Sequence, residues 1–408
     1  MIKYSEIKIT NLEILCRSLK GRCLNIKKIK FYTKQFIQRA DMFLLMMCCI
    51  CALYGITMVY SVTSGMAAAG ALSNPSKFVI VQTFSVFLGI AAYVILTVID
   101  ADLLGKQWKF LFAINIGLLV ALMIFGQDDG TGNKSWIRFG SLIGFQPSEI
   151  IKVIYIIIAA KQMTYLKENK DLNSFVSIVQ MAGNFLIVFG LIVVVSSDLG
   201  SASIILCIFI TMLFAVGVKL YWFAIGGATV AAFIPLLWNY FLKDYQKKRL
   251  IAPYDPGVDP RGDGILWQTN QSKLALASGR LTGIDADHSQ VIFTGKHTDF
   301  IFAGIGEKLG MLGCLLVMLL LIIIIIHCIR VGIHSGRTFD MLICIGVASS
   351  VIFQSLVNIG MCIGITPVIG ITLPFFSYGG SSMMTMFAAM GLVSGIKYKP
   401  KPQLFSMM

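Results

Sequence analysis

Ionisable residues interrupt long apolar runs at a few points of this sequence, and chemistry is expected at those points. Asp299 stands where a polar stretch ends and apolar sequence begins, directly after His297 and Thr298. A carboxylate in a partly desolvated cleft can accept a proton from a hydroxyl group, whereas one at a helix start can simply be stabilised by the helix dipole. Both interpretations fit Asp299, and His297 is interpreted as a supporting hydrogen-bond group.

A second set of polar residues contains two cations and a carboxylate, namely Arg138, Lys152 and Glu149. Trp136 and Arg138 precede a segment, 146–152, that begins Gln-Pro-Ser-Glu and ends in Lys152. Proline fits the first position of a helix, and Glu149 and Lys152 share a helix face because they are three residues apart. This segment predicts either a capped helix start with a neutralising ion pair, or an external mouth where Arg138 and Lys152 receive phosphate or another anion.

Two more polar positions lie beside apolar runs. Asp198 occupies a tight turn, where it caps the following helix or pairs with Arg138 or Lys152. Near the carboxyl end, a segment rich in glycine and serine favours close helix packing or an external anion-binding turn. The residues of interest in that segment are Ser377, Gly379, Gly380 and Ser381.

The amino-acid composition is that of a membrane protein. The chain has 408 residues, of which 57% are hydrophobic and 13% charged. Soluble domains are typically about 45–50% apolar and about 25% charged. The charge here is too low to cover a globule of this size, and a disordered chain would need low hydrophobicity and high charge. We therefore expect an all-α, polytopic integral protein of the cytoplasmic membrane.

About ten runs are long enough to cross the hydrocarbon core, which takes about 20 apolar residues per helix. They lie near residues 42–62, 78–99, 109–126, 147–164, 177–197, 200–218, 221–241, 299–326, 340–365 and 378–396.

The distribution of charge predicts the orientation. Residues 1–40 hold ten Lys or Arg and two Glu, a net charge of +8, which is typical of a cytoplasmic segment that touches anionic membrane lipid. Nucleic-acid binding is not expected, because no fold with interleaved aromatic residues surrounds this segment. With the amino terminus inside, an even number of spans returns the tail, 399–408, to the cytoplasm.

The membrane domain is expected to span 41–398 and to include one large extracytoplasmic loop, 242–298. This loop is polar and rich in Gly and Pro, and loops of such length are usually functional or disordered. Its Trp267 and the apolar stretch 274–276 suggest that it folds back on the membrane face. None of the ten cysteines lies in it, which excludes a disulfide framework there.

Six segments together resemble the SEDS family, the polytopic cell-wall polymerases of the FtsW, RodA and SpoVE type. They occur in family order and cover about residues 41–397. These segments are Asp41 with Val59-Tyr60-Ser61, Trp136-Ile137 with the 146–152 segment, Asp198-Leu199-Gly200, Gln268 with Ser272, the run from His297 to Phe302, and the run from Pro374 to Ser382.

The resemblance implies a glycosyltransferase that polymerises lipid II outside the cytoplasmic membrane, with a class B penicillin-binding protein (a transpeptidase) and divisome or elongasome proteins as partners. It implies that Asp299 is the catalytic carboxylate. No cofactor is evident, although a divalent cation, Mg²⁺ or Mn²⁺, is compatible with this chemistry. Predicted substrate-binding residues are Trp136, Arg138, Glu149, Lys152, Asp198, Gln268, Ser272, His297, Ser377, Gly379, Gly380 and Ser381.

Two departures from the family pattern lie close to Asp299. Gly295 stands where the family commonly has Glu, and Lys308 replaces the second Glu of a Glu-Glu-Leu-Gly pattern. Glu307 and Lys308 are expected to neutralise each other or to line the same cleft. Two alternatives to the polymerase remain open: a flippase that transports lipid II, and a noncatalytic scaffold of the cell-wall machinery.

Overall fold

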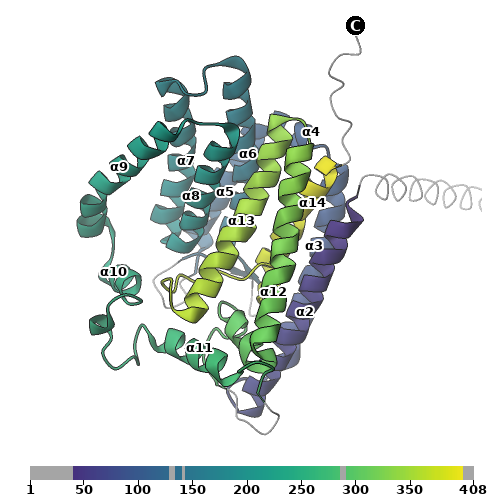
Figure 1. The fold of residues 1–408 in the computed structure, drawn as a ribbon, viewed down its shortest axis with the longest axis vertical. Coiled ribbons are helices and arrows are strands. Elements are labelled where there is room, and N and C mark those ends of the chain that lie inside the picture. Colours follow the sequence, from purple (N-terminus) through teal and green to yellow (C-terminus); the bar gives the residue numbers. More distant parts are fainter. Residues whose placement is uncertain (1–39, 128–133, 140–142, 285–290, 398–408) are drawn as a thin grey trace, which may run out of the picture.

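The computed structural model describes residues 40–127, 134–139, 143–284 and 291–397, which form an almost entirely helical protein (Figure 1). Nearly all of the basic segment 1–40, and the whole tail 399–408, lie outside the described residues. The α-helices are α2 (Met42–Ala68), α3 (Pro75–Val98), α4 (Ala101–Lys106), α5 (Trp108–Phe125), α6 (Pro147–Asn169), α7 (Phe175–Ser196), α8 (Leu199–Val216), α9 (Leu220–Leu236), α10 (Asp244–Ile251), α11 (Trp267–Ser278), α12 (Ile301–His334), α13 (Thr338–Ile363) and α14 (Gly380–Lys397).

Eight described segments are long and apolar enough to cross a membrane: α2, α3, α5, α7, α8, α9 with its continuation, α12 and α13. Helices α6 and α14 are also long and pack within the same bundle. Helix α6 is interrupted by Glu149, Lys152 and Lys161, which makes it less apolar. With these two the described residues supply ten crossing helices, so the predicted all-α polytopic fold is confirmed.

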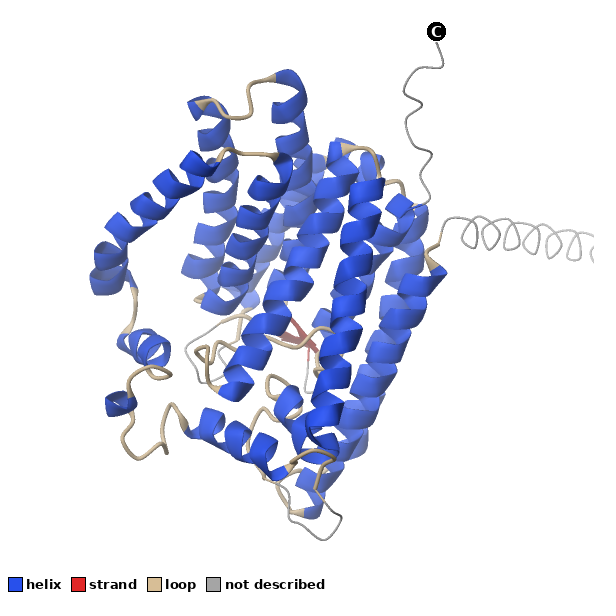
Figure 2. Cartoon of the chain, viewed as in Figure 1, coloured by secondary structure: helices blue, strands red, loops and turns tan. Residues whose placement is uncertain are grey.

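The two ends of the bundle differ in structure. Helix α4 lies at one end, the predicted cytoplasmic one, and α10 and α11 lie at the opposite end (Figure 1). The predicted external loop is therefore partly helical, with a π-helical turn η1 (Leu237–Phe241) before it and a 3₁₀ turn η2 (Pro256–Val258) within it. A hairpin that the apolar pattern did not predict, β1 (Ile137–Phe139) with antiparallel β2 (Ile143–Phe145), lies among the helices (Figure 2).

Helices α3 and α14 approach closely because glycine stands at their contacts. A Cβ atom at Gly391 would lie 2.6 Å from the carbonyl oxygen of Tyr93, and one at Gly89 would lie 2.9 Å from the Phe387 ring. Small residues at helix interfaces allow backbones to come together in this way. The Thr97 hydroxyl donates to the Gly391 carbonyl over 3.3 Å, which adds a hydrogen bond across the same contact.

Asp41 joins four helices at the predicted cytoplasmic end. Its carboxylate caps α2 by accepting from the Leu44 amide, and it forms ion pairs with His327 of α12 and with Lys397 of α14, the latter at 3.0 Å. The Tyr93 hydroxyl of α3 donates to the Asp41 carbonyl over 2.9 Å. Because the Asp41 side chain is fully buried, these partners compensate for its removal from water.

The cysteines pack as apolar residues. All eight within the described ranges are free, and Cys48 and Cys51 are buried in α2.

Helix α9 is exposed along its length, since none of its residues is buried against the bundle, and it stands apart from α7 and α8 in Figure 1. In a membrane, lipid is the solvent for such an apolar helix.

The α3–α14 contact predicts a stability difference between two glycine substitutions. Gly391→Ala places a methyl group against backbone, so we expect a loss of about 1–3 kcal/mol and a lower melting temperature in detergent. Gly183→Ala in α7 is the matched control, because no atom lies within 4 Å of a Cβ there. Equal melting temperatures for the two variants would contradict the packing described here.

Candidate functional site

Asp299 lies in a turn at the external end of the bundle, directly before α12. The helix begins at Ile301 with Phe300 as its N-cap, so Asp299 lies one residue before the cap position. The Asn358 side chain of α13 donates to the Asp299 carbonyl over 2.7 Å and to the Ile371 carbonyl over 2.6 Å. One buried amide thus joins the turn to the loop between α13 and α14, and Asp299 itself remains only half-buried.

The Asp299 carboxylate faces Gly370 of that loop. A Cβ atom at Gly370 would lie 3.6 Å from Asp299 Oδ2, and the residue has a φ of +69°, which favours glycine. Gly370 also lines a small cavity of about 10 Å³, which we name the polar well. The polar well is lined by Gln146, Glu149, Lys152, Ser201, Ile204, Gln354, Gly370, Ile371 and Thr372.

Glu149 and Lys152 form a buried ion pair in the polar well. Pro147 begins α6, as the sequence predicts, and Lys152 Nζ lies 2.8 Å from Glu149 Oε1. Their side chains are only 5% and 2% exposed, respectively. Glu149 Oε2 and the Gln354 side-chain oxygen have no hydrogen-bond partner among the described residues. The polar well therefore presents buried acceptors with unused capacity close to Asp299.

Asp198 caps α8, which was one of its two predicted functions. Its carboxylate accepts from the Ser201 amide over 2.9 Å and from the Ser201 hydroxyl over 2.7 Å. The Gln146 side chain also donates to it over 3.3 Å. Lys152 is paired with Glu149 instead. The described structure thus connects the α8 turn to the start of α6 through hydrogen bonds and shows no ion pair at Asp198.

The glycine- and serine-rich segment is bonded to the Asp299 turn. The Ser377 hydroxyl accepts from the Leu373 amide and donates to the Thr298 carbonyl, both over 2.7 Å, and the Tyr378 amide donates to the His297 carbonyl over 3.0 Å. These contacts fit the packing interpretation of the segment, since its hydroxyl and amide groups are used within the protein.

The remaining residues of this segment connect it to other elements. The Gly379 amide donates to the Gln82 side chain of α3 over 3.2 Å, and the Ser381 hydroxyl accepts from the Gln146 amide over 3.2 Å. A Cβ atom at Gly380 would lie 3.2 Å from the Ser85 hydroxyl oxygen. The segment therefore holds α3 and the start of α6 against α14.

Helix α11 supports the Asp299 turn from outside. Gln268 donates through its side chain to the Thr294 carbonyl over 3.3 Å, and the buried Ser272 hydroxyl donates to the Cys362 carbonyl of α13 over 2.8 Å. The predicted folding back of the long loop is thus observed for α11, while the predicted substrate binding by Gln268 and Ser272 stays a prediction.

Trp136 and Arg138 lie on the β1–β2 hairpin. The Trp136 ring covers Gly144, where a Cβ atom would lie 3.1 Å from the ring, and Arg138 stands opposite Gly144 with an exposed side chain. Arg138 and the buried Lys152 therefore occupy different environments, one at the surface and the other in the polar well.

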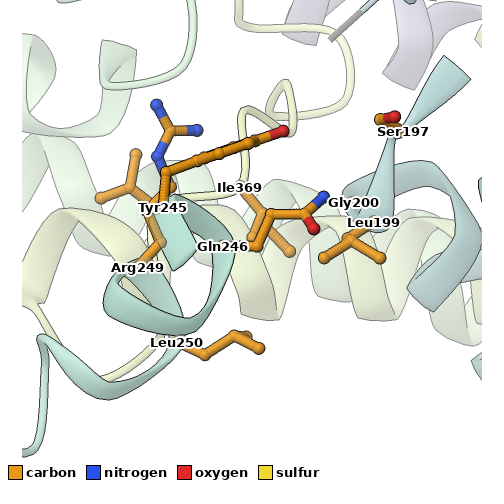
Figure 3. A pocket seen from close by; sticks show the side chains of 9 residues that line it. Ser197, Leu199, Gly200, Tyr245, Gln246, Arg249, Leu250 and Ile369 are labelled. Carbon is orange, nitrogen blue, oxygen red and sulfur yellow. The ribbon is translucent and has the colours of Figure 1, made fainter. Parts of the chain in front are cut away.

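Helix α10 covers the turn that holds Asp198. A pocket of about 20 Å³ lies between α10, the start of α8 and the α13–α14 loop, and Figure 3 shows Tyr245, Gln246 and Arg249 of α10 on one side, near Ile369, and Leu199 and Gly200 on the other. The sequence did not predict Arg249 as a site residue. Its position beside Ile369 brings a cation to the same external face as the polar well.

A buried ion pair holds the segment before Asp299, and the sequence did not predict it. Lys296 pairs with Glu307 of α12, and both side chains are fully buried. Lys296 Nζ also donates to the Val291 carbonyl over 2.7 Å, while Glu307 accepts from the Val291 amide over 2.6 Å. Burial lowers the pKa of Lys296, and Glu307 opposes that shift. The expected partner of Glu307, Lys308, is therefore replaced by Lys296.

His297 is a partly buried, neutral ring. Burial lowers its pKa from the ordinary 6.5 to about 4, so the ring is uncharged at neutral pH. It packs against Phe78 and Tyr378 with ring centroids 4.8 and 5.8 Å away. Nδ1 has no hydrogen-bond partner among the described residues. His297 thus packs beside Asp299 as part of an aromatic group, and its predicted supporting hydrogen bond stays a prediction.

The described residues contain no group of three or more His, Cys, Asp or Glu side chains that could hold a metal ion. A divalent cation at this site would therefore need ligands from a bound substrate in addition to protein carboxylates, and its involvement stays a prediction.

The fold and site define a polytopic membrane protein with a half-buried carboxylate above a polar well. A family model described as a cell cycle protein, FtsW/RodA/SpoVE, matches residues 41–401. Peptidoglycan glycosyltransferase MrdB of Escherichia coli K12 is 33% identical over 321 residues, which are 76% of this chain and 82% of the relative. Stage V sporulation protein E of Bacillus subtilis is 30% identical over 363 residues, which are 87% and 96% of the two chains.

Solved structures agree with this relationship. A chain of a peptidoglycan synthase complex, from work on the structural coordination of polymerization and crosslinking, superposes with a TM-score of 0.72 at 25% identity, over 88% of this chain and 97% of that one. Rod shape determining protein RodA of Thermus thermophilus shows the same fold, with a TM-score of 0.62 at 22% identity, over 88% and 96% of the chains. This chain belongs to the FtsW/RodA/SpoVE (SEDS) family and is a multi-pass protein of the cytoplasmic membrane.

The Lys296–Glu307 pair predicts strong coupling between two substitutions. Lys296→Met alone leaves the buried Glu307 carboxylate without its cation, and Glu307→Gln alone leaves the buried Lys296 ammonium without its anion. We expect each single substitution to lower the free energy of unfolding by about 3–5 kcal/mol. The double variant Lys296→Met/Glu307→Gln should lose much less than the sum. Thermal unfolding of the purified variants measures this, with Lys308→Met as a control expected near wild type. Additive losses would show that the two residues are not coupled.

His297 predicts a pH effect on stability. Its folded pKa of about 4 lies below the unfolded value, so the unfolded chain binds the extra proton first as pH falls through 6.5. Stability should therefore drop between pH 6.5 and 4, by up to roughly 3 kcal/mol from this group. His297→Phe keeps the aromatic packing and should show a smaller drop in melting temperature from pH 7 to pH 5. An unchanged drop would argue against the shift.

Proposed function

We propose that this protein is a peptidoglycan glycosyltransferase that polymerises lipid II into glycan strands at the outer face of the cytoplasmic membrane and releases undecaprenyl diphosphate. The observation that carries the proposal is the half-buried Asp299 carboxylate, held by its own backbone to α13 at the external end of the bundle, beside Gly370 and the polar well. The relatives named as peptidoglycan glycosyltransferases support glycosyl transfer as the reaction.

Asp299 serves as the general base in this proposal. The acceptor sugar hydroxyl attacks the anomeric carbon of the donor, the bond from that carbon to the diphosphate oxygen breaks, and the hydroxyl proton passes to the carboxylate. Direct displacement inverts the anomeric centre and needs only one carboxylate. A positioned base typically contributes about 10²–10⁴-fold to the rate. The hydrogen bonds of Asn358 and Ser377 fix the turn and so hold the base in place.

Cations near the polar well stabilise the departing diphosphate. Arg138 is exposed on the hairpin, where it can meet the lipid-linked diphosphate at the membrane face. Lys152 is buried and shares its charge with Glu149, but an ammonium has three donors and Glu149 takes one. Interactions that strengthen as negative charge develops on the leaving group contribute directly to the rate. A Mg²⁺ or Mn²⁺ ion bound with the diphosphate would act in the same direction.

The partner in this proposal is a class B penicillin-binding protein, whose transpeptidase activity cross-links the new strands, within the divisome or elongasome. The support is the similarity to a chain of a peptidoglycan synthase complex in which polymerization and crosslinking are coordinated. Helix α9 has no buried residue, so its surface is available for contact with such a partner.

The polymerase assignment predicts the effect of neutralising one carboxylate. Asp299→Asn should lower glycan-strand formation from labelled lipid II by at least about 100-fold, because the base is lost. Purified protein, alone and with its penicillin-binding protein, should be assayed after size-exclusion chromatography confirms folding. Asp263→Asn in the same external loop is the matched control, since Asp263 is exposed and should leave the rate unchanged.

A folded Asp299→Asn variant that polymerises at the normal rate would overturn the assignment of the base. If both that variant and the wild type moved lipid II across vesicle membranes without forming strands, the transporter alternative would replace the polymerase.

A further inference from the structure

A second candidate site lies in the half of the bundle away from Asp299. An open apolar groove of about 460 Å³ runs between α5, α6 and α7. Its apolar walls come from Phe112 of α5, Ile158 of α6 and Ile187 of α7, and Trp108 and Tyr165 stand at its cytoplasmic mouth. The volume falls within the range of about 300–1,000 Å³ for pockets that bind small molecules.

Two amides of the groove, Asn184 and Gln162, form hydrogen bonds within the protein. The Asn184 side chain of α7 donates to Gln162 of α6 over 2.8 Å, and Gln162 donates to the Gln180 carbonyl over 2.8 Å. These bonds hold α6 and α7 together along one side of the groove. Both amides thus have partners within the protein, and the apolar walls fit an apolar chain.

Lys161 is the one lining residue of the groove with a charge, and no described residue forms an ion pair with it. Its side chain is exposed, and no hydrogen bond or ion pair joins it to another described residue. It lies about 12 Å from the carboxyl end of α6, at 1.5 Å per residue. A lysine beside apolar walls in a membrane extends toward the interface or meets an anion. Lys161 lines both the groove and the polar cavity beside it, where it can receive a negative group.

A polar cavity of about 390 Å³ adjoins the groove and shares Lys161 with it. The buried Thr164 hydroxyl lines this cavity and has no hydrogen-bond partner among the described residues. Arg337 lines it as well, but both its terminal nitrogens bind Asp102, over 2.7 and 2.8 Å. Glu168 adds a negative charge further toward the cytoplasm. An anion is thus favoured beside Lys161 and Thr164 and opposed closer to Glu168.

The mouth of the groove has the residues of a membrane interface. Trp108 and Tyr165 are 42% and 51% exposed, and Lys109 Nζ lies 5.8 Å from the centre of the Trp108 ring. Aromatic rings and lysines gather at the level of lipid headgroups. The groove therefore matches a molecule with an apolar chain and a phosphate. The apolar walls fit the chain, and Lys161, near the aromatic mouth, fits the phosphate.

We propose that this groove binds one anionic glycerophospholipid of the cytoplasmic leaflet. An acyl chain lies along Phe112, Ile158 and Ile187, and the phosphate meets Lys161 and the Thr164 hydroxyl. A transmembrane helix of a partner protein is a poorer occupant, because it would bury Lys161 without neutralising it. The bound lipid fills the space between α5, α6 and α7 and so supports α6, whose other end carries Glu149 and Lys152.

The test uses the purified full chain in detergent, with phosphatidylglycerol or phosphatidylcholine added and bound lipid counted by native mass spectrometry. Wild type should retain one phosphatidylglycerol in preference to phosphatidylcholine. Lys161→Gln should raise the half-saturating phosphatidylglycerol concentration about five-fold, as expected for one lysine at an anionic lipid. Lys167→Gln, an exposed lysine on α6 outside the groove, is the control and should bind as wild type does.

A second pair of variants tests the groove itself. Ile187→Trp fills it and should abolish phosphatidylglycerol retention, whereas Val194→Trp, at a 78% exposed position on α7 outside the groove, should not. Equal retention by both tryptophan variants, or no preference for phosphatidylglycerol over phosphatidylcholine, would overturn the proposal. Undecaprenyl phosphate that displaced phosphatidylglycerol at equimolar amounts would also overturn it, in favour of the carrier lipid as occupant.

Discussion

Charged side chains can be buried in this apolar bundle only with partners, and the position of those partners determines how the helices and loops are held together. Asp41 satisfies this constraint at the cytoplasmic end through His327 and Lys397, so that one carboxylate connects α2, α12 and α14. Lys296 and Glu307 satisfy it at the external end. Breaking such a pair leaves a buried charge, which is far more costly than losing a surface ion pair.

The same constraint distinguishes Asp299 from the other carboxylates. Glu307 and Asp41 are fully buried and paired, whereas Asp299 is half-buried and its backbone carbonyl, through Asn358, provides the anchor. This anchor uses the backbone carbonyl of Asp299 and not its carboxylate. Ser377 adds a second anchor by donating to the neighbouring Thr298 carbonyl. The turn is thus held through its backbone, and the half-buried carboxylate faces Gly370, which fits the proposed general base.

Local patterns predicted most of the fold and part of the site. The crossing helices, the start of α6 at Pro147, the Glu149–Lys152 pair and the cap at Asp198 follow from hydropathy, helix geometry and spacing over a few residues. Three features could not be predicted in this way: the Lys296–Glu307 pair, the Asn358 hydrogen bonds to two loops, and the cover formed by α10. Each depends on contacts between segments distant in sequence, which a single sequence does not reveal.

The two departures from the family pattern near Asp299 are compatible with this arrangement. Gly295 has a φ of +82°, a conformation that glycine adopts without strain, and its carbonyl accepts from the amides of Thr298 and Phe300. Lys308 does not compete for Glu307, because Lys296 already neutralises that carboxylate from within the protein. The absence of acidic residues at both positions therefore changes the charge near the turn, while the Asn358 and Ser377 bonds to the turn come from other residues.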